Sequence, residues 1–521
     1  MELLLSTLRT GVSLLRKMKR NLLMYKYFKG IKDLPADRNY TIVINTARDG
    51  QLIELYLGYI LSRRGHKVYI LLDDNLLKHT DTAQIHKVKL NTSRMSRIVK
   101  SIDEMMIYFI IKNDNLDILL YSSLIDGNID DVLLTANDYK HAVSSCKRYF
   151  EEGDFVNNSQ SKNDYYKRSI HNCKISKKLA KYIVYGLRPD IFITSNGIYS
   201  TWGPCFDYVK THGVKSLVFD FNVHYNKRIL ILDTIWQRMS EDSDWKKFKD
   251  HELTVKQKNL VEKVFDSRIN HAAQDTSIYY SNVVRGGSQK LMDVKKGKIT
   301  YGIFPNVIWD GDISDRDIYF EGVIDWIIST VKYVREKTNN NIIIRFHPAE
   351  STMHSGSLSM YAAITRKAPG LLDDENIQII KSEDAVDSYT LARRFIDIGL
   401  VYSGTMALEL TYMGIPVLSP ANSFYNNVKI TIPIQSRSEY MNLLIRPDLI
   451  LKQFEDQKPE IMKNLYTFAY WYFIHNTFEI PIISEKKIYR VRFDQIKSSD
   501  EIDPRTNGEI LRLINKIENY V

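Results

Sequence analysis

Short apolar runs alternate with amphipathic segments in two separate parts of the chain, and this alternation limits the folds available to it. The first series begins at "YTIVINT" (40–46), passes through a helix-like segment that ends near Gly65, and continues in "HKVYILLDD". The second begins at "KITYGIFPNVIWDGD". Strand, helix and strand in this order form the unit of a parallel sheet covered by helices. We therefore expect an α/β chain with two facing Rossmann-like domains, helical insertions and a helical C-terminal segment.

The chain has 521 residues, more than a single hydrophobic core usually holds. We expect a basic amphipathic helix over 1–35, a first Rossmann-like domain with a helical insertion over 36–228, a helical connection over 229–290, a second Rossmann-like domain over 291–452, and a helical segment over 453–521.

The N-terminal segment mixes apolar and basic residues, but it has no apolar run of the roughly 20 residues that a membrane span needs. Two interpretations are open. The segment lies on an anionic membrane surface, or it packs on the body of the protein. The net charge of +10 favours an anionic partner.

Other partners and compartments are limited by what the sequence lacks. No helix-turn-helix, zinc-finger or aromatic RNA-binding pattern occurs, so we expect no nucleic-acid partner. The three cysteines, Cys146, Cys173 and Cys205, are widely spaced and form no CxxC pattern. A reducing, cytoplasmic setting fits this usage.

Ligands of parallel sheets bind beyond the carboxyl ends of the strands, so polar residues that end apolar runs are the candidates for a site. They are Arg48, Asp49 and Gly50; Ser195, Asn196 and Gly197; Asp220, Asn222 and His224; Pro305, Asn306, Trp309 and Asp310; Arg345, His347, Pro348 and Glu350; and Ser403, Gly404 and Thr405.

The stretch "LVYSGTMALELTYMGIPVLSP" (400–420) is the most informative of these. Ser403, Gly404 and Thr405 fall where a strand meets a helix, and free N–H groups at a helix start favour a phosphate. Glu409 follows about one turn later, where a carboxylate can accept the hydroxyls of a ribose. The alternatives are that the turn only caps the helix and that Glu409 is a solvated helix position.

The stretch "RFHPAE" gives a second group of candidates. Pro348 favours an extended backbone at His347, which then projects from a strand end and can donate to a phosphate. Arg345 lies two residues earlier, on the opposite strand face from Phe346, and is a further candidate for binding the nucleotide.

Three motifs together resemble a known family. "FPNVIWD", "IIIRFHPAE" and "YSGTMALELTYMGIPVLSP", in this order and spacing, resemble the capsule polysaccharide biosynthesis family of glycosyltransferases, which have the GT-B fold. The Ser-Gly pair followed by Glu six residues after the Ser is also similar to UDP-GlcNAc 2-epimerases, which share that fold. The resemblance covers roughly residues 185 to 425.

The resemblance implies a nucleotide-activated sugar bound by the C-terminal domain and an acceptor bound by the N-terminal domain. It assigns the donor phosphate to His347 and to the turn 403–405, and the ribose to Glu409. A CMP-linked acid sugar and a UDP- or GDP-linked sugar both stay open as donors.

The chemistry also needs a general base for the acceptor hydroxyl. Asp49 is the first choice, followed by Asp220 and His224, although each residue is also suited to a turn or a cap. No Asp-x-Asp pair ends a strand, and "DGDISDRD" near 310 is interpreted as a loop. We therefore expect no metal and no cofactor, with helix N-termini and basic side chains neutralising the leaving phosphate.

These inferences predict a cytoplasmic glycosyltransferase, peripheral at the inner face of the plasma membrane, that adds a sugar to a glycan or lipid-linked acceptor in capsule or other surface-polysaccharide biosynthesis. One alternative is a non-hydrolysing UDP-GlcNAc 2-epimerase. The other is a non-catalytic protein that binds nucleotide sugars as a scaffold in polysaccharide assembly.

Overall fold

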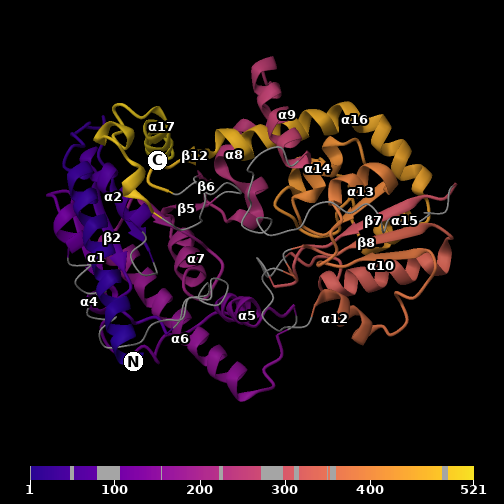
Figure 1. Ribbon diagram of the computed structural model, residues 1–521, viewed down its shortest axis with the longest axis horizontal. Coiled ribbons are helices and arrows are strands. Elements are labelled where there is room, and N and C mark those ends of the chain that lie inside the picture. The colour runs from indigo at the N-terminus through magenta and orange to yellow at the C-terminus, as the bar shows by residue number, and fades with distance from the viewer. Residues whose placement is uncertain are drawn as a thin grey trace. The chain divides into compact units, whose positions relative to one another are not determined.

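The computed structural model describes residues 2–46, 52–78, 106–153, 155–221, 227–270, 297–309, 316–348, 350–351, 359–483 and 491–521. The chain divides into two compact units (Figure 1). The first comprises Met1–Ser145, Asn157–Ile235 and Thr477–Val521, and the second comprises Cys146–Val156 and Trp236–Asn476.

The first unit is built on a sheet in which seven strands are described, in the order β12-β6-β5-β4-β1-β2-β3. The strands are β1 (Thr41–Asn45), β2 (Lys67–Leu72), β3 (Leu116–Leu120), β4 (Ile191–Thr194), β5 (Lys215–Phe221), β6 (Lys227–Leu232) and β12 (Thr477–Glu479). Strands β1 to β5 pair in parallel, whereas β6 and β12 each add an antiparallel strand at one edge. The order 3-2-1-4-5 is that of a Rossmann-type sheet.

Helices surround this sheet. They are α1 (Glu2–Phe28), α2 (Leu52–Arg63), α4 (Tyr121–Leu124), α5 (Ala136–Phe150), α6 (Gln160–Tyr182) with the π-turn η1 (Ile183–Leu187), α7 (Gly203–Thr211), the 3-10 turns η6 (Phe493–Gln495) and η7 (Ser499–Glu501), and α17 (Gly508–Glu518). Helix α5 spans the division between the units at Ser145 and Cys146.

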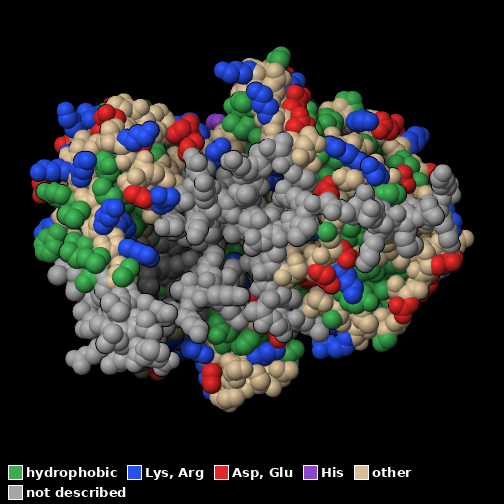
Figure 2. Space-filling view, viewed as in Figure 1, with side chains coloured by type: hydrophobic (Ala, Val, Ile, Leu, Met, Phe, Trp, Pro, Cys, Tyr) green, Lys and Arg blue, Asp and Glu red, His purple; other side chains and the backbone are tan. Residues whose placement is uncertain are grey.

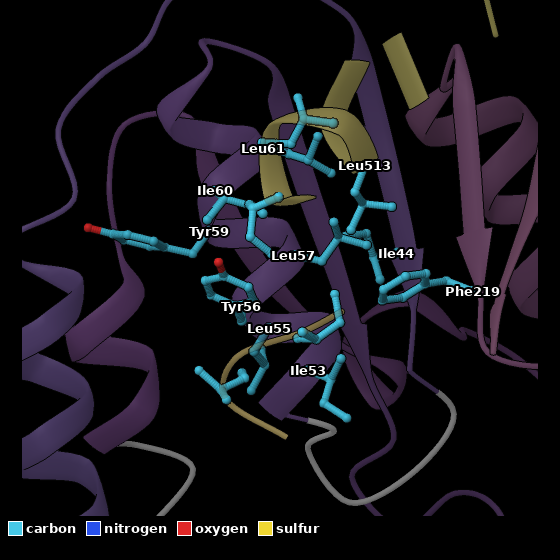
Figure 3. Packing of buried hydrophobic residues seen from close by; sticks show 14 of the residues in the cluster. Ile44, Ile53, Leu55, Tyr56, Leu57, Tyr59, Ile60, Leu61, Phe219 and Leu513 are labelled. Carbon is cyan, nitrogen blue, oxygen red and sulfur yellow. The ribbon is translucent and has the colours of Figure 1, made fainter. Parts of the chain in front are cut away.

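One face of the first sheet holds a large apolar core. Side chains alternate between the faces of a strand, so Ile42 and Ile44 of β1 point to the same side. Residues of α2, together with Phe219 of β5 and Leu513 of α17, pack over Ile44 (Figure 3). The C-terminal helix is therefore part of the first core.

The second unit has a sheet of five described strands in the order β11-β10-β7-β8-β9, all parallel. The strands are β7 (Thr300–Phe304), β8 (Asn341–Arg345), β9 (Ile377–Ile380), β10 (Ile398–Val401) and β11 (Val417–Leu418). Helices α10 (Val323–Lys337) and α12 (Met360–Lys367) lie on one face, and α13 (Ser388–Phe395) and α14 (Met406–Tyr412) on the other (Figure 1). Other described helices of this unit are η2 (Trp236–Glu241), α8 (Ser243–Phe248), α9 (Val255–Ile269), η4 (Asn426–Val428), α15 (Arg437–Leu444), α16 (Pro447–Tyr470) and the π-turn η5 (Trp471–His475).

The structure confirms an α/β chain with two Rossmann-like domains, but two expected boundaries differ from the observed units. The expected connection 229–290 begins with β6 of the first sheet, and its helix α9 buries Val261, Phe265 and Ile269 in the second unit. The expected helical segment 453–521 is divided: α16 stays in the second unit, whereas Thr477–Val521 returns to the first. Strand β12 explains the return, because it pairs with β6.

The N-terminal helix forms as expected, over Glu2–Phe28, and its last turns are anchored. Met24 and Phe28 are fully buried in the first core, and the Phe28 ring stacks on Tyr59 of α2 with centroids 4.8 Å apart. The expected packing on the body of the protein therefore holds for the end of this helix.

We predict that Leu513→Ala lowers the free energy of unfolding by about 2–5 kcal/mol, because it leaves a cavity in the core of the first unit. Denaturant unfolding of the full chain measures the change. Asn515→Ala, on the exposed side of the same helix, is the matched control and should change the stability by less than about 0.5 kcal/mol. Equal stability of both variants would show that α17 is not a core element.

Candidate functional site

The second sheet reverses its strand order between β7 and β10, and this point brings two of the sequence motifs together. Strands β8 and β9 extend to one side of β7, while β10 and β11 extend to the other. Ligands of such sheets bind outside the carboxyl ends of the strands at this switch point. Asn306 follows β7 and Ser403 follows β10, and the Ser403 hydroxyl donates to Asn306 Oδ1 at 3.3 Å.

The turn that begins α14 is open and does not cap its own helix. Thr405 occupies the N-cap position but makes no side-chain capping bond, so the capping alternative fails for this residue. A Cβ added to Gly404 would meet no atom closer than 3.9 Å, whereas one added to Gly399 would meet Leu410 Cδ1 at 2.6 Å. Packing therefore requires glycine at position 399 but not at position 404. The bare backbone at Gly404 suits the close approach of a ligand.

Glu409 is fully buried one turn into α14, so the alternative of a solvated position is wrong. Arg268 of α9 donates to Glu409 Oε1, from Nε at 2.8 Å and from Nη2 at 2.5 Å. Glu409 Oε2 has no hydrogen-bond partner in the structure. Burial raises the pKa of the Glu409 carboxyl, and the Arg268 guanidinium opposes that rise. The carboxylate thus offers one oxygen to a ligand, not two.

Arg345 and His347 lie at the end of the neighbouring strand β8, and they differ in environment. Arg345 is buried and donates to the backbone carbonyls of Lys381, Asp384 and Val386 in the segment after β9. His347 is partly exposed just beyond the strand. These contacts show that Arg345 holds the segment after β9 in place. Binding of the nucleotide-sugar donor by Arg345 or His347 stays a prediction.

The first sheet has the same kind of switch point, between β1 and β4. Two buried polar atoms there lack hydrogen-bond partners in the structure: Asn45 Nδ2 at the end of β1 and Ser195 Oγ just after β4. The Tyr121 hydroxyl donates to Asn45 Oδ1, which fixes the amide and leaves its nitrogen for a ligand. This edge is the candidate acceptor side of the chain.

The three residues predicted for the general base are only partly covered by the structure. Asp49 and His224 lie outside the described residues, as does Asp310 of the second domain. Asp220 lies in β5, with its backbone paired to Ile229 of β6, and its side chain is partly exposed. Its role as a base stays a prediction.

Sequence reasoning missed Arg268 and Asn45. Arg268 belongs to a segment interpreted as a charged connection, although Val261, Phe265 and Ile269 recur every four residues there and signal a packed helix face. Asn45 ends the apolar run "IVIN", and a polar side chain at the end of a buried strand was the available signal.

Among the described residues, no group of three or more His, Cys, Asp or Glu side chains could hold a metal ion. Within the same part of the chain, every helix is too short or too polar to span a membrane.

No protein-family model matches the sequence, and no curated protein matches it. Solved structures do. KpsC of Thermosulfurimonas dismutans, a beta-Kdo 2,4 transferase, is 12% identical with a TM-score of 0.39, over 63% of this chain and 86% of that one. The UDP-GlcNAc 2-epimerase of Neisseria meningitidis, solved with UDP-GlcNAc, is 13% identical with a TM-score of 0.26, over 84% and 99%.

The wall teichoic acid polymerase TagF is 11% identical with a TM-score of 0.21, over 99% of this chain and 98% of that one. The similar structures thus include a beta-Kdo transferase, a UDP-GlcNAc 2-epimerase and a wall teichoic acid polymerase. All of these TM-scores lie below 0.5, so the case for a function rests on the chain's own residues.

We predict that Arg345→Met lowers the free energy of unfolding by about 1–3 kcal/mol, because the backbone carbonyls after β9, including the buried one of Val386, lose their hydrogen-bond donor. Denaturant unfolding checks this, with Arg366→Met on the exposed face of α12 as the control. Unchanged stability combined with lost nucleotide binding would instead make Arg345 a donor-binding residue.

Proposed function

We propose that the chain is a glycosyltransferase that moves a sugar from a nucleotide-activated donor to a surface-glycan or lipid-linked acceptor, as in capsule polysaccharide biosynthesis. The observation that carries the proposal is the switch point of the second sheet. There the turn 403–405 leaves its helix start uncapped, and a buried carboxylate one turn away keeps Oε2 without a partner.

Each part of a nucleotide sugar has a counterpart at this point. The backbone N–H groups at the start of α14 suit the phosphate, and Gly404 lets it approach. Glu409 Oε2 suits one hydroxyl of the ribose, since a carboxylate is the stronger acceptor in such a bond. His347, just beyond strand β8 on the other side of β7, is the proposed further contact to the phosphate.

The proposed reaction joins the acceptor oxygen to the anomeric carbon and breaks the bond from that carbon to the nucleotide phosphate. The acceptor proton passes to a general base, for which Asp49, Asp220 and His224 remain the candidates. The nucleotide leaves with its charge met by the helix start and by basic side chains. The acceptor is assigned to the first unit, at the edge that holds Asn45 and Ser195.

The two alternatives, a 2-epimerase and a non-catalytic scaffold, predict different assay results. A 2-epimerase converts UDP-GlcNAc with no acceptor present, so assay of UDP-GlcNAc alone separates it from a transferase. A scaffold binds the donor without turnover in any acceptor assay.

We predict that one of CMP, UDP, GDP, dTDP and CDP raises the melting temperature of the full chain, since a ligand that binds only the folded state stabilises it. Glu409→Gln should weaken binding of that nucleotide by about 1–3 kcal/mol, the cost of losing a charge-assisted hydrogen bond. Calorimetric titration measures the affinity. Glu336→Gln, at an exposed position of α10, should bind as the wild type does.

No shift with any of the five nucleotides would contradict the transferase proposal. A shift that Glu409→Gln leaves unchanged would keep nucleotide binding but remove Glu409 from the site.

The proposal includes an anionic membrane surface as a partner, at the cytoplasmic face, because α1 exposes an apolar stripe flanked by cations. Leu15 and Leu22 are seven residues apart and so lie on one face of the helix, where they are 66% and 64% exposed. Met18 and Tyr25 lie on the same side. No acidic residue occurs over 3–32, while eight Lys and Arg do. Figure 2 shows apolar and basic side chains intermingled at the left, where Figure 1 draws α1 and α2.

We predict that the double variant Leu15→Ser/Leu22→Ser sediments less with vesicles of phosphatidylcholine and phosphatidylglycerol, because apolar area at the interface is lost. Point changes are preferable to removing the helix, since Met24 and Phe28 belong to the core. Leu133→Ser, at a residue 88% exposed elsewhere, is the control. Equal sedimentation of the double variant and the wild type would refute the membrane partner.

A further inference from the structure

Arg268 is the last charged residue of α9, a helix that lies outside the second sheet, yet its side chain reaches the candidate nucleotide site. Only 11% of that side chain is exposed. The guanidinium carbon lies 5.3 Å from the centroid of the Phe473 ring, so an aromatic face holds the charged group on one side.

The contacts of the guanidinium make the two oxygens of the Glu409 carboxylate differ in their hydrogen bonding. Nε and Nη2 both donate to Oε1, at 2.8 and 2.5 Å, and Oε2 keeps no partner. Nη2 also approaches Thr405 Oγ1 at 3.5 Å, the limit for a hydrogen bond. One side chain therefore touches both the residue proposed for the ribose and the turn proposed for the phosphate.

The surroundings make Arg268 the source of charge balance for Glu409. The titratable groups recorded near the carboxylate in the described residues are Arg268, Tyr425 and Tyr472. Burial raises the pKa of Tyr425 to about 12, and it raises that of Tyr472 as well, so both phenols are neutral near pH 7. A buried carboxylate without a cation tends to take up a proton.

We propose that Arg268 is a positioning residue for the nucleotide: by binding Oε1, it holds Glu409 as a carboxylate with Oε2 left for the ribose hydroxyl. The inference rests on the proposed function and extends it, because nucleotide binding then depends on α9, which lies outside the Rossmann-type fold. A protonated Glu409 would accept the hydroxyl poorly, so a chain without this cation should bind nucleotide only when the carboxyl is ionised.

The test compares the full chain with Arg268→Met by calorimetric titration between pH 6 and 9, using the tightest of CMP, UDP, GDP, dTDP and CDP. The ratio of variant to wild-type affinity at each pH cancels the titration of the nucleotide itself. We expect Arg268→Met to bind at least about tenfold more weakly at pH 7 and to recover toward the wild type at pH 9, since affinity follows the ionised fraction.

Two further variants distinguish positioning from a purely structural ion pair. Arg268→Lys keeps the charge and should keep a pH profile like that of the wild type. In the double variant Arg268→Met/Glu409→Gln, loss of Arg268 should add little to the loss from Glu409→Gln alone, because both changes remove the same contact. The double variant also leaves no buried unpaired carboxylate, so it tests the coupling even if Arg268→Met alone fails to fold.

The outcomes separate the two claims. If the wild type binds no nucleotide of the panel, the proposed function fails and the role of Arg268 fails with it. If the wild type binds but Arg268→Met binds equally well, or loses affinity by a factor that is constant with pH and additive with Glu409→Gln, the role of Arg268 alone is refuted.

Discussion

Parallel pairing of short buried strands is the constraint on which both units depend. The backbone N–H and C=O groups of such strands pair only with neighbouring strands. Between two parallel strands the chain must return to the starting edge of the sheet through a crossover, which is usually a helix. The carboxyl ends of the strands then share one edge, so polar residues that are distant in sequence meet there. Asn306 and Ser403 are 97 residues apart and joined by a hydrogen bond for this reason.

The buried charge of Glu409 is the feature that packing alone does not explain. An ionised carboxylate without water is stabilised only by a cation and hydrogen bonds, and the guanidinium of Arg268 supplies these to one oxygen. The other oxygen is buried and unpartnered, which is costly in an apolar setting. Function is a reason for retaining such a group, and a hydroxyl donor from a ligand would satisfy it.

The sequence predicted the regular part of this structure well, because the period of apolar residues reports directly on buried strands and helix faces. The strand at 41–45, the motif "LVYSGT" at a strand end and the N-terminal helix all lie where the patterns indicated. Strand β12 was missed, since its three residues carry no periodic signal and pair with a strand about 250 residues earlier.

The residues of the candidate site likewise differ in whether local sequence patterns could predict them. Ser403 and Gly404 could be found from sequence because they follow an apolar run and precede a helix. The contact of Arg268 with Glu409 could not, because the packed face of α9 does not tell which segment of the chain covers it. Arg268 reaches Glu409 through a tertiary contact between residues 141 positions apart in the sequence. The burial of Glu409 has the same origin, since neighbouring helices cover a position that helix periodicity alone leaves ambiguous.

Hydrogen exchange of the full chain, with and without its tightest-binding nucleotide, tests the central claim most directly. If the nucleotide binds at the switch point of the second sheet, amides over 402–413 and at Asn306 should exchange more slowly in its presence, because bound phosphate and ribose order the start of α14. Protection confined to the ends of β1 and β4, with 402–413 unchanged, would place the nucleotide in the first unit and contradict the account.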